Sequence, residues 1–229
     1  MALPVVKTPT YDLVIPSTGQ KVKYRPFLVK EEKILMVAAE SEDRKEIMNA
    51  MKQIVISCVE DEIDVNDLAT FDLEYIFISL RSKSVGETVD LTVKCEFCDE
   101  ENKTRLDFAD IKVTEQGDAS NKVEITDSMG IVMKYPSIDG ISKIENADPI
   151  GVIKGCIDYI YDDKQVYKAS EADPSELDDF VNSLGYKEME KVKAFFDSMP
   201  KITKDVKFKC NSCKKQNTMT IEGFDNFFV

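Results

Sequence analysis

The sequence predicts an α+β protein built from two similar modules that share one four-cysteine zinc ribbon. Three observations lead to this prediction. A β-hairpin pattern opens each half of the 229-residue chain, helical periodicity follows, and a Cys-x-x-Cys between two strands closes each half. The predicted boundaries are an extended N-terminal arm at 1–10, module 1 at 11–112, a linker at 113–122, module 2 at 123–224 and an aromatic tail at 225–229.

The first elements of both modules have the pattern of a β-hairpin. In residues 11–27, apolar residues alternate on both sides of a turn that contains Pro16 and Gly19. Residues 123–138 again place two short strands around a polar turn that ends at Gly130. A Lys-Tyr pair follows the turn glycine at the same spacing in both halves. The repeated pattern favours a duplication, and shared local propensities are the alternative explanation.

Helices are predicted where apolar residues recur at helical spacing. Four such segments are 42–59, 70–83, 174–184 and 186–199. Another helix opens at Asp148 and Pro149, which are typical of an N-cap and a first helical position, and we expect it to carry Ile150, Ile153, Ile157 and Ile160. Cys58 and Cys156 lie on or beside apolar faces, so we expect both to pack in the core.

Each module ends in a strand, a Cys-x-x-Cys turn and a second strand. The two segments are VDLTVKCEFCDEENKTRLDF (89–108) and DVKFKCNSCKKQNTMTIEGF (205–224). In both, a lysine precedes the first cysteine and an asparagine follows four residues after the second. One such turn aims two sulfurs at a common point, which is half of a tetrahedral site. The two turns together predict one structural zinc per chain, bound by Cys95, Cys98, Cys210 and Cys213.

Other uses of these cysteines remain open. A redox-active Cys-x-x-Cys, iron in place of zinc, and unligated thiols are the alternatives. Four cysteine ligands leave no open coordination position, so a metal at this site is expected to be structural and not catalytic.

The two cysteine hairpins carry opposite charge. Residues 90–101 contain five acids and one lysine, whereas residues 204–215 contain five lysines and one acid. Such hairpins complement each other, and the lysines offset the negative charge of a zinc tetrathiolate. The competing interpretation is that Lys207, Lys209, Lys214 and Lys215 contact nucleic acid.

Composition narrows the function further. The net charge of −13 disfavours general binding to nucleic acid or anionic membranes, and no apolar run reaches the ~20 residues that span a bilayer. The first residues lack the pattern of a secretory signal, so we expect a cytosolic protein with reduced cysteines. The chain has no histidine, Walker loop, GxGxxG or GxSxG, which disfavours an enzyme or a small-molecule substrate.

The two termini are candidate contact segments. Residues 1–10 contain Pro4 and Pro9 and little regular pattern, which is typical of an extended arm. The chain ends in FDNFFV, and an aromatic terminus either folds back on its own core or docks on a partner.

Several segments resemble the baseplate hub assembly proteins of T4-like contractile-tailed phages. They are TPTYDLVIPSTGQKVKYRPFLVKEEKILMVAAE (8–40), LRSKSVGE (80–87) and the two cysteine hairpins. The resemblance implies a late protein that builds the central hub of the tail baseplate through contacts with other hub proteins. It implies a location in the host cytoplasm during assembly and in the tail baseplate of the virion. A zinc-ribbon accessory protein of transcription or replication that contacts nucleic acid is the alternative, and an enzyme is third.

Overall fold

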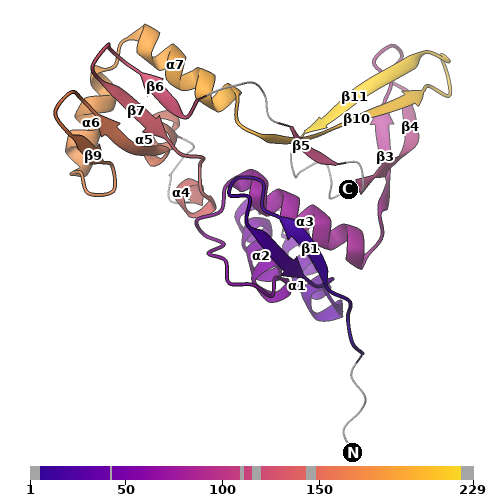
Figure 1. Ribbon diagram of the computed structural model, residues 1–229. Helices are drawn as coiled ribbons and strands as arrows, with labels where there is room; N and C mark the ends of the chain where they lie inside the picture. Colours follow the sequence, from indigo (N-terminus) through magenta and orange to yellow (C-terminus); the bar gives the residue numbers. More distant parts are fainter. Residues whose placement is uncertain (1–5, 42, 109–110, 115–119, 143–147, 223–229) are drawn as a thin grey trace, which may run out of the picture. The chain divides into compact units, whose positions relative to one another are not determined.

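A computed structural model describes residues 6–41, 43–108, 111–114, 120–142 and 148–222, which form a mixed α+β structure (Figure 1). Contacts divide the chain into two units. The first unit contains the chain up to Val65, Phe71–Thr114 and the chain from Lys201 onward, and the second contains Asn66–Thr70 and Glu115–Pro200. No helix within the described ranges is both long enough and apolar enough to span a bilayer.

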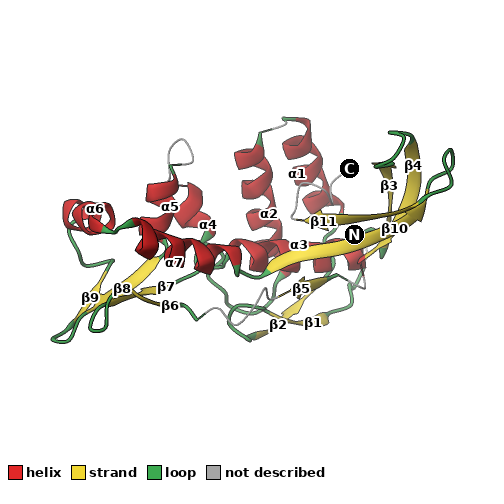
Figure 2. Ribbon diagram, turned by 90° about the horizontal axis from the view of Figure 1, so that it is seen from above, coloured by secondary structure: helices red, strands yellow, loops and turns green. Residues whose placement is uncertain are grey.

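The first unit opens with a hairpin and three helices. These elements are β1 (Tyr11–Val14), β2 (Lys21–Tyr24), α1 (Val29–Glu40), α2 (Arg44–Cys58) and α3 (Thr70–Ser84). β1 and β2 are antiparallel, and Gly19 adopts a φ of 69° in the turn between them, which glycine tolerates without strain. The Asp43 side chain accepts a hydrogen bond from the Lys45 N–H and so caps α2. α1 and α2 pack side by side (Figure 2).

The first unit also contains both cysteine hairpins. Its strands are β3 (Thr88–Lys94), β4 (Glu101–Asp107), β5 (Lys112–Thr114), β10 (Lys201–Lys209) and β11 (Gln216–Glu222). β3 and β4 form one antiparallel sheet, and β11, β10 and β5 form another in that order. β5 begins at the end of predicted module 1 and runs into the predicted linker, where it pairs with the start of β10.

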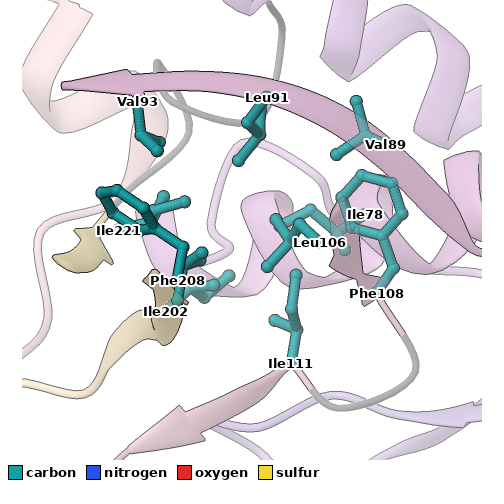
Figure 3. Packing of buried hydrophobic residues seen from close by; sticks show 11 residues of the cluster. Ile78, Val89, Leu91, Val93, Leu106, Phe108, Ile111, Ile202, Phe208 and Ile221 are labelled. Carbon is teal, nitrogen blue, oxygen red and sulfur yellow. The ribbon is translucent and has the colours of Figure 1, made fainter. Parts of the chain in front are cut away.

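One apolar cluster joins these two sheets (Figure 3). Alternate residues of β3 are buried, and Val93 lies on the side of Ile221 and Phe208 of the second hairpin, whereas Val89 lies beside Phe108. Leu106 from β4 and Ile78 from α3 belong to the same cluster. The two hairpins therefore meet through apolar faces.

The second unit is a four-stranded antiparallel sheet with helices. Its elements are β6 (Lys122–Glu124), β7 (Gly130–Met133), α4 (Ile138–Ser142), α5 (Pro149–Gly155), β8 (Ile157–Tyr161), β9 (Val166–Lys168), α6 (Pro174–Ser183) and α7 (Tyr186–Asp197). The strand order is β6-β7-β8-β9. Its separate core contains Ile131, Met133, Ile157, Val192 and Phe195, among others.

The helix predicted from Asp148 through Ile160 is wrong in its second half. Asp148 caps α5 as predicted, by accepting hydrogen bonds from the N–H groups of Ile150 and Gly151. The helix ends at Gly155, and Ile157 and Ile160 lie in β8 instead. β-branched and aromatic residues dominate β8, and pairing with β7 satisfies their backbone groups, so the sheet outcompetes the helix.

The remaining predicted elements are present in the described residues. Both opening hairpins and the helices predicted at 42–59, 70–83, 174–184 and 186–199 appear with shifts of one or two residues at their ends. Cys58 and Cys156 are buried free thiols, as expected, and burial raises the pKa of each to about 11. The sequence did not predict α1, α4, β5 or β9. The predicted tail at 225–229 lies outside the described residues.

Candidate metal centre

The first cysteine turn is built by backbone hydrogen bonds around Cys95. The Cys95 N–H donates to the Glu100 carbonyl at 3.0 Å, and the Asp99 N–H donates to the Cys95 carbonyl at 2.9 Å. Asp99 takes a φ of 57°, a left-handed conformation that aspartate tolerates better than most residues. The tight turn brings Cys98 back beside Cys95, so that both sulfurs face the same side.

The second turn repeats this geometry around Cys210. The Cys210 N–H donates to the Lys215 carbonyl at 2.9 Å, and the Lys214 N–H donates to the Cys210 carbonyl at 3.1 Å. Lys214 has a φ of 62°, and it stands one residue after Cys213, as Asp99 stands one residue after Cys98. The two turns therefore have the same local backbone structure.

The two turns bring the four predicted ligands together. The sulfurs of Cys95, Cys98, Cys210 and Cys213 all lie within 4.8 Å of one another. The Cys95 and Cys213 sulfurs are 3.6 Å apart, as are those of Cys98 and Cys210. Zinc–sulfur bonds of ~2.3 Å in a tetrahedron place sulfurs about 3.8 Å apart. A disulfide needs ~2.05 Å. The spacing therefore fits a tetrahedral metal ion, and all four cysteines are free.

Hydrogen bonds to sulfur decide how the thiols ionise. Burial opposes ionisation of Cys210, but the backbone N–H groups of Cys213 and Ser212 outweigh it and lower the Cys210 pKa to about 6. Cys95 is also buried, yet the Phe97 N–H and neighbouring side chains lower its pKa. The Glu100 N–H favours ionised Cys98, but burial and the adjacent thiols raise the Cys98 pKa to about 12. Four thiolates repel one another, so a cation is needed to hold all of them ionised.

The opposite charges of the two hairpins lie outside the surfaces through which the hairpins pack, because those surfaces are apolar. The predicted charge complementarity at the turns stays a prediction. At the turns themselves, the Lys215 ammonium lies 4.3 Å from the centre of the Phe97 ring. Asp90 pairs with Arg105 of its own hairpin. Lys207 and Lys209 are exposed on β10.

Two residues near the sulfurs were not assigned a role from sequence. Asn102 and Asn217 are each 2% exposed, and each lies beside the opposite cysteine turn. The only sign in the sequence is their equal distance from the second cysteine of each turn, which indicates a repeat but not a contact between the repeats.

Taken with the mixed fold, this cluster defines the class of protein: an α+β protein whose first unit holds four cysteines that could bind one metal ion. A comparison with known families matches residues 8–229, nearly the whole chain, to the family described as T4 bacteriophage base plate protein. The chain belongs to this family, which confirms the resemblance to phage baseplate proteins. The family is one of phage structural proteins. No curated protein and no solved structure matches the chain.

Proposed function

We propose that the protein is a non-enzymatic component that assembles or supports the baseplate hub of a phage tail through contacts with other baseplate proteins. The observation that carries this proposal is the family match over residues 8–229. A role in the hub, action during assembly in the host cytoplasm, and presence in the finished virion are the finer parts of the proposal.

Within this function, the metal centre stabilises the first unit. A zinc ion on Cys95, Cys98, Cys210 and Cys213 would tie β3–β4 to β10–β11, which are far apart in sequence. The ion would supply charge neutralisation and fixed tetrahedral geometry, with no open position for a reacting molecule. A rigid ribbon suits a protein that has to present surfaces to partners in fixed positions.

The described surface of the first unit offers an apolar patch for such a partner. α1 leaves Val29, Met36 and Val37 exposed by 67%, 59% and 69%, and Leu28 before it by 40%. Val29 and Met36 are two helical turns apart and so share one face. Apolar clusters on a surface are typical of protein–protein contacts, and we infer that this α1 patch docks on another baseplate protein. The N-terminal arm is a second contact segment, since Val6 is 87% exposed.

We expect the double substitution Met36→Lys with Val37→Lys to weaken binding to baseplate partners about tenfold or more, because two charges would enter an apolar contact. Folding should be little affected, since both side chains already face water. The measurement is co-purification with baseplate hub proteins, expressed together with the chain. Asn49→Lys with Gln53→Lys on exposed positions of α2 is a control with the same change in charge.

Deleting residues 1–9 tests the N-terminal arm in the same assay, and deleting residues 225–229 tests the predicted C-terminal arm. Unchanged binding in the α1 variant and in both truncations would rule out these contacts. If the intact chain binds no baseplate protein at all, the proposed function itself fails.

The alternative function, contact with nucleic acid, has one structural observation in its favour, which is the exposed Lys207 and Lys209 on β10. We nevertheless expect no binding at physiological salt. The Lys215 ammonium lies over the Phe97 ring, and the turn that contains Phe97 also carries exposed Glu96, Asp99 and Glu100, whose negative charge opposes binding of a phosphate backbone. A gel shift at micromolar protein measures this. A complex that salt weakens, and that is lost when Lys214 and Lys215 are changed to Gln, would favour the alternative.

We also propose that modules 11–112 and 123–224 derive from a duplication, separated by a linker at 113–122. The contacts that define the two units do not follow this division, because the second cysteine hairpin packs on the first. One local contact supports the proposal. The Arg25 N–H donates to the Cys58 carbonyl, and the Lys134 N–H donates to the Cys156 carbonyl, at 3.0 and 2.7 Å. In both halves the second hairpin strand thus meets the buried cysteine that ends a helix.

A further inference from the structure

Two asparagines are buried at the point where the cysteine hairpins meet. Asn102 in β4 and Asn217 in β11 are each 2% exposed, and the described residues contain few other buried polar side chains. Burying an unpaired amide is costly, so amides at such positions are normally hydrogen-bonded. The bonds that these two residues form cross from one hairpin to the other.

Each asparagine accepts a hydrogen bond from the opposite turn. The Asn211 N–H donates to Asn102 Oδ1 at 2.8 Å, and the Glu96 N–H donates to Asn217 Oδ1 at 3.0 Å. Glu96 directly follows Cys95, and Asn211 directly follows Cys210. The same atom of each asparagine therefore binds the same position of the other turn, and the exchange is reciprocal.

The amide nitrogens bind their own hairpins, whereas the amide oxygens bind the opposite turn. Asn102 Nδ2 donates to the Glu100 carbonyl of its own hairpin at 2.8 Å, and Asn217 Nδ2 donates to the Lys215 carbonyl at 3.1 Å. These carbonyl partners, together with the backbone N–H groups above, fix which end of each amide is oxygen and which is nitrogen.

The asparagines also lie near the sulfurs. Asn102 Nδ2 lies 3.7 Å from the sulfur of Cys210, and the Asn217 side chain, at the equivalent position of the other hairpin, helps to lower the pKa of Cys95. Each asparagine thus contacts the first cysteine of the opposite turn. A neutral amide with one acceptor and two donors can make these bonds at once, whereas a carboxylate has no donor and an aliphatic side chain has neither.

We propose that Asn102 and Asn217 are positioning residues of the metal centre, which hold the two cysteine turns against each other and donate hydrogen bonds to the ligand sulfurs. This inference rests on the proposed metal site. A tetrathiolate around a divalent ion has a net charge of −2, and N–H groups directed at sulfur stabilise that charge. Partners behind the ligands commonly change metal affinity 10–100-fold when they are removed.

The test uses the full chain, loaded with cobalt(II) for spectroscopy and with zinc for kinetics. The variants are Asn102→Ala, Asn217→Ala, Asn102→Asp and Asn217→Asp. Lys103→Ala and Thr218→Ala are matched controls, because each is an exposed neighbour on the same strand. We expect zinc transfer to a chelator to be about tenfold faster or more in each asparagine variant and unchanged in the controls. The cobalt d–d bands should shift in the variants.

The aspartate variants separate the two roles. Aspartate keeps the oxygen that accepts from the opposite backbone and has nearly the same shape, but it loses both the donor to sulfur and the donor to the Glu100 or Lys215 carbonyl of its own hairpin. If the asparagines act on the metal, the aspartate variants should release zinc at least as fast as the alanine variants, since aspartate also adds a negative charge. Release at the parent rate would mean that the sulfur contacts have no effect and would overturn the inference. Because aspartate is close in size to asparagine, the aspartate variants can still be compared with the parent if an alanine variant does not fold.

The parent chain distinguishes failure of the inference from failure of the metal site. A parent that shows no cobalt–tetrathiolate spectrum contradicts both the metal centre and its positioning residues. A parent that binds cobalt, with parental release rates and spectra in all four asparagine variants, overturns the inference alone and leaves the proposed metal centre intact.

Discussion

Replacing Cys210 with serine should remove the metal and unfold the two cysteine hairpins of the first unit, β3–β4 and β10–β11. Structural zinc sites contribute ~10–16 kcal/mol in small zinc-binding peptides, which is as large as the whole stability of a typical domain at ~5–15 kcal/mol. The parent should contain about one equivalent of zinc by metal analysis, and the variant should contain none. Its melting temperature should fall, and chelation of metal from the parent should reproduce the effect.

Amide hydrogen exchange shows which strands lose their structure in the Cys210→Ser variant. Protection should be lost in β3, β4, β10 and β11, whereas β7, β8 and α7 should keep theirs, because the second unit has its own apolar core. Cys156→Ala is the control, since it removes a buried thiol from the second unit and should leave the metal content unchanged. A Cys210→Ser protein that keeps one zinc and the parental melting temperature would contradict the metal centre.

Replacing Glu31 with alanine should destabilise the first unit by about 3 kcal/mol or more, because it leaves Arg25 without its buried partner. Glu31 is 2% exposed, and its carboxylate lies 3.0 Å from the Arg25 guanidinium. It also accepts from the Leu28 N–H at 2.9 Å, which caps the start of α1. Urea unfolding at pH 7 measures the loss. Glu32→Ala is the control, since Glu32 is exposed in the same helical turn.

The effect of Glu31 should depend on pH in a defined direction. Burial raises the Glu31 pKa, but the hydrogen bonds from Arg25 and Leu28 outweigh burial and lower it below its usual value of 4.5. A lowered pKa in the folded state means that the carboxylate stabilises the fold above the unfolded pKa, and this contribution is lost as pH falls through the folded value. The stability gap between parent and Glu31→Ala should therefore be full at pH 7 and smaller at pH 3. A gap that widens at pH 3 would contradict this assignment.

The local signals in the sequence were sufficient for most elements. Asp148 predicted a helix start because an aspartate side chain accepts from backbone N–H groups two residues on, a contact that involves only neighbours in sequence, and in the structure Asp43 and Asp173 cap helices in the same way. The strands beside both Cys-x-x-Cys turns were predicted, and the structure buries alternate residues in β3 and in the second half of β10. The spacing alone was sufficient to predict that the four cysteines lie together, since two tight Cys-x-x-Cys turns each direct two thiols to one side.

Short apolar segments were harder to assign. Ile150, Ile153, Ile157 and Ile160 have helical spacing, yet only the first two are helical, because β7 offers a strand edge that the sequence does not reveal. α1 was not predicted because its sequence also lacks a clear local pattern. Several of its apolar residues face water, and its buried positions include Glu31, so its pattern does not show one apolar face.

The sequence by itself therefore determined the α+β class, the turns and the four cysteines, all of which depend on residues a few positions apart. Tertiary structure decided which segments meet. It paired β5 with β10, grouped the second cysteine hairpin with the first unit, and set Asn102 against Asn211 and Asn217 against Glu96. These contacts join residues about a hundred positions apart, and their free energy comes from burial and hydrogen bonds that exist only once the chain has folded, so no local pattern encodes them.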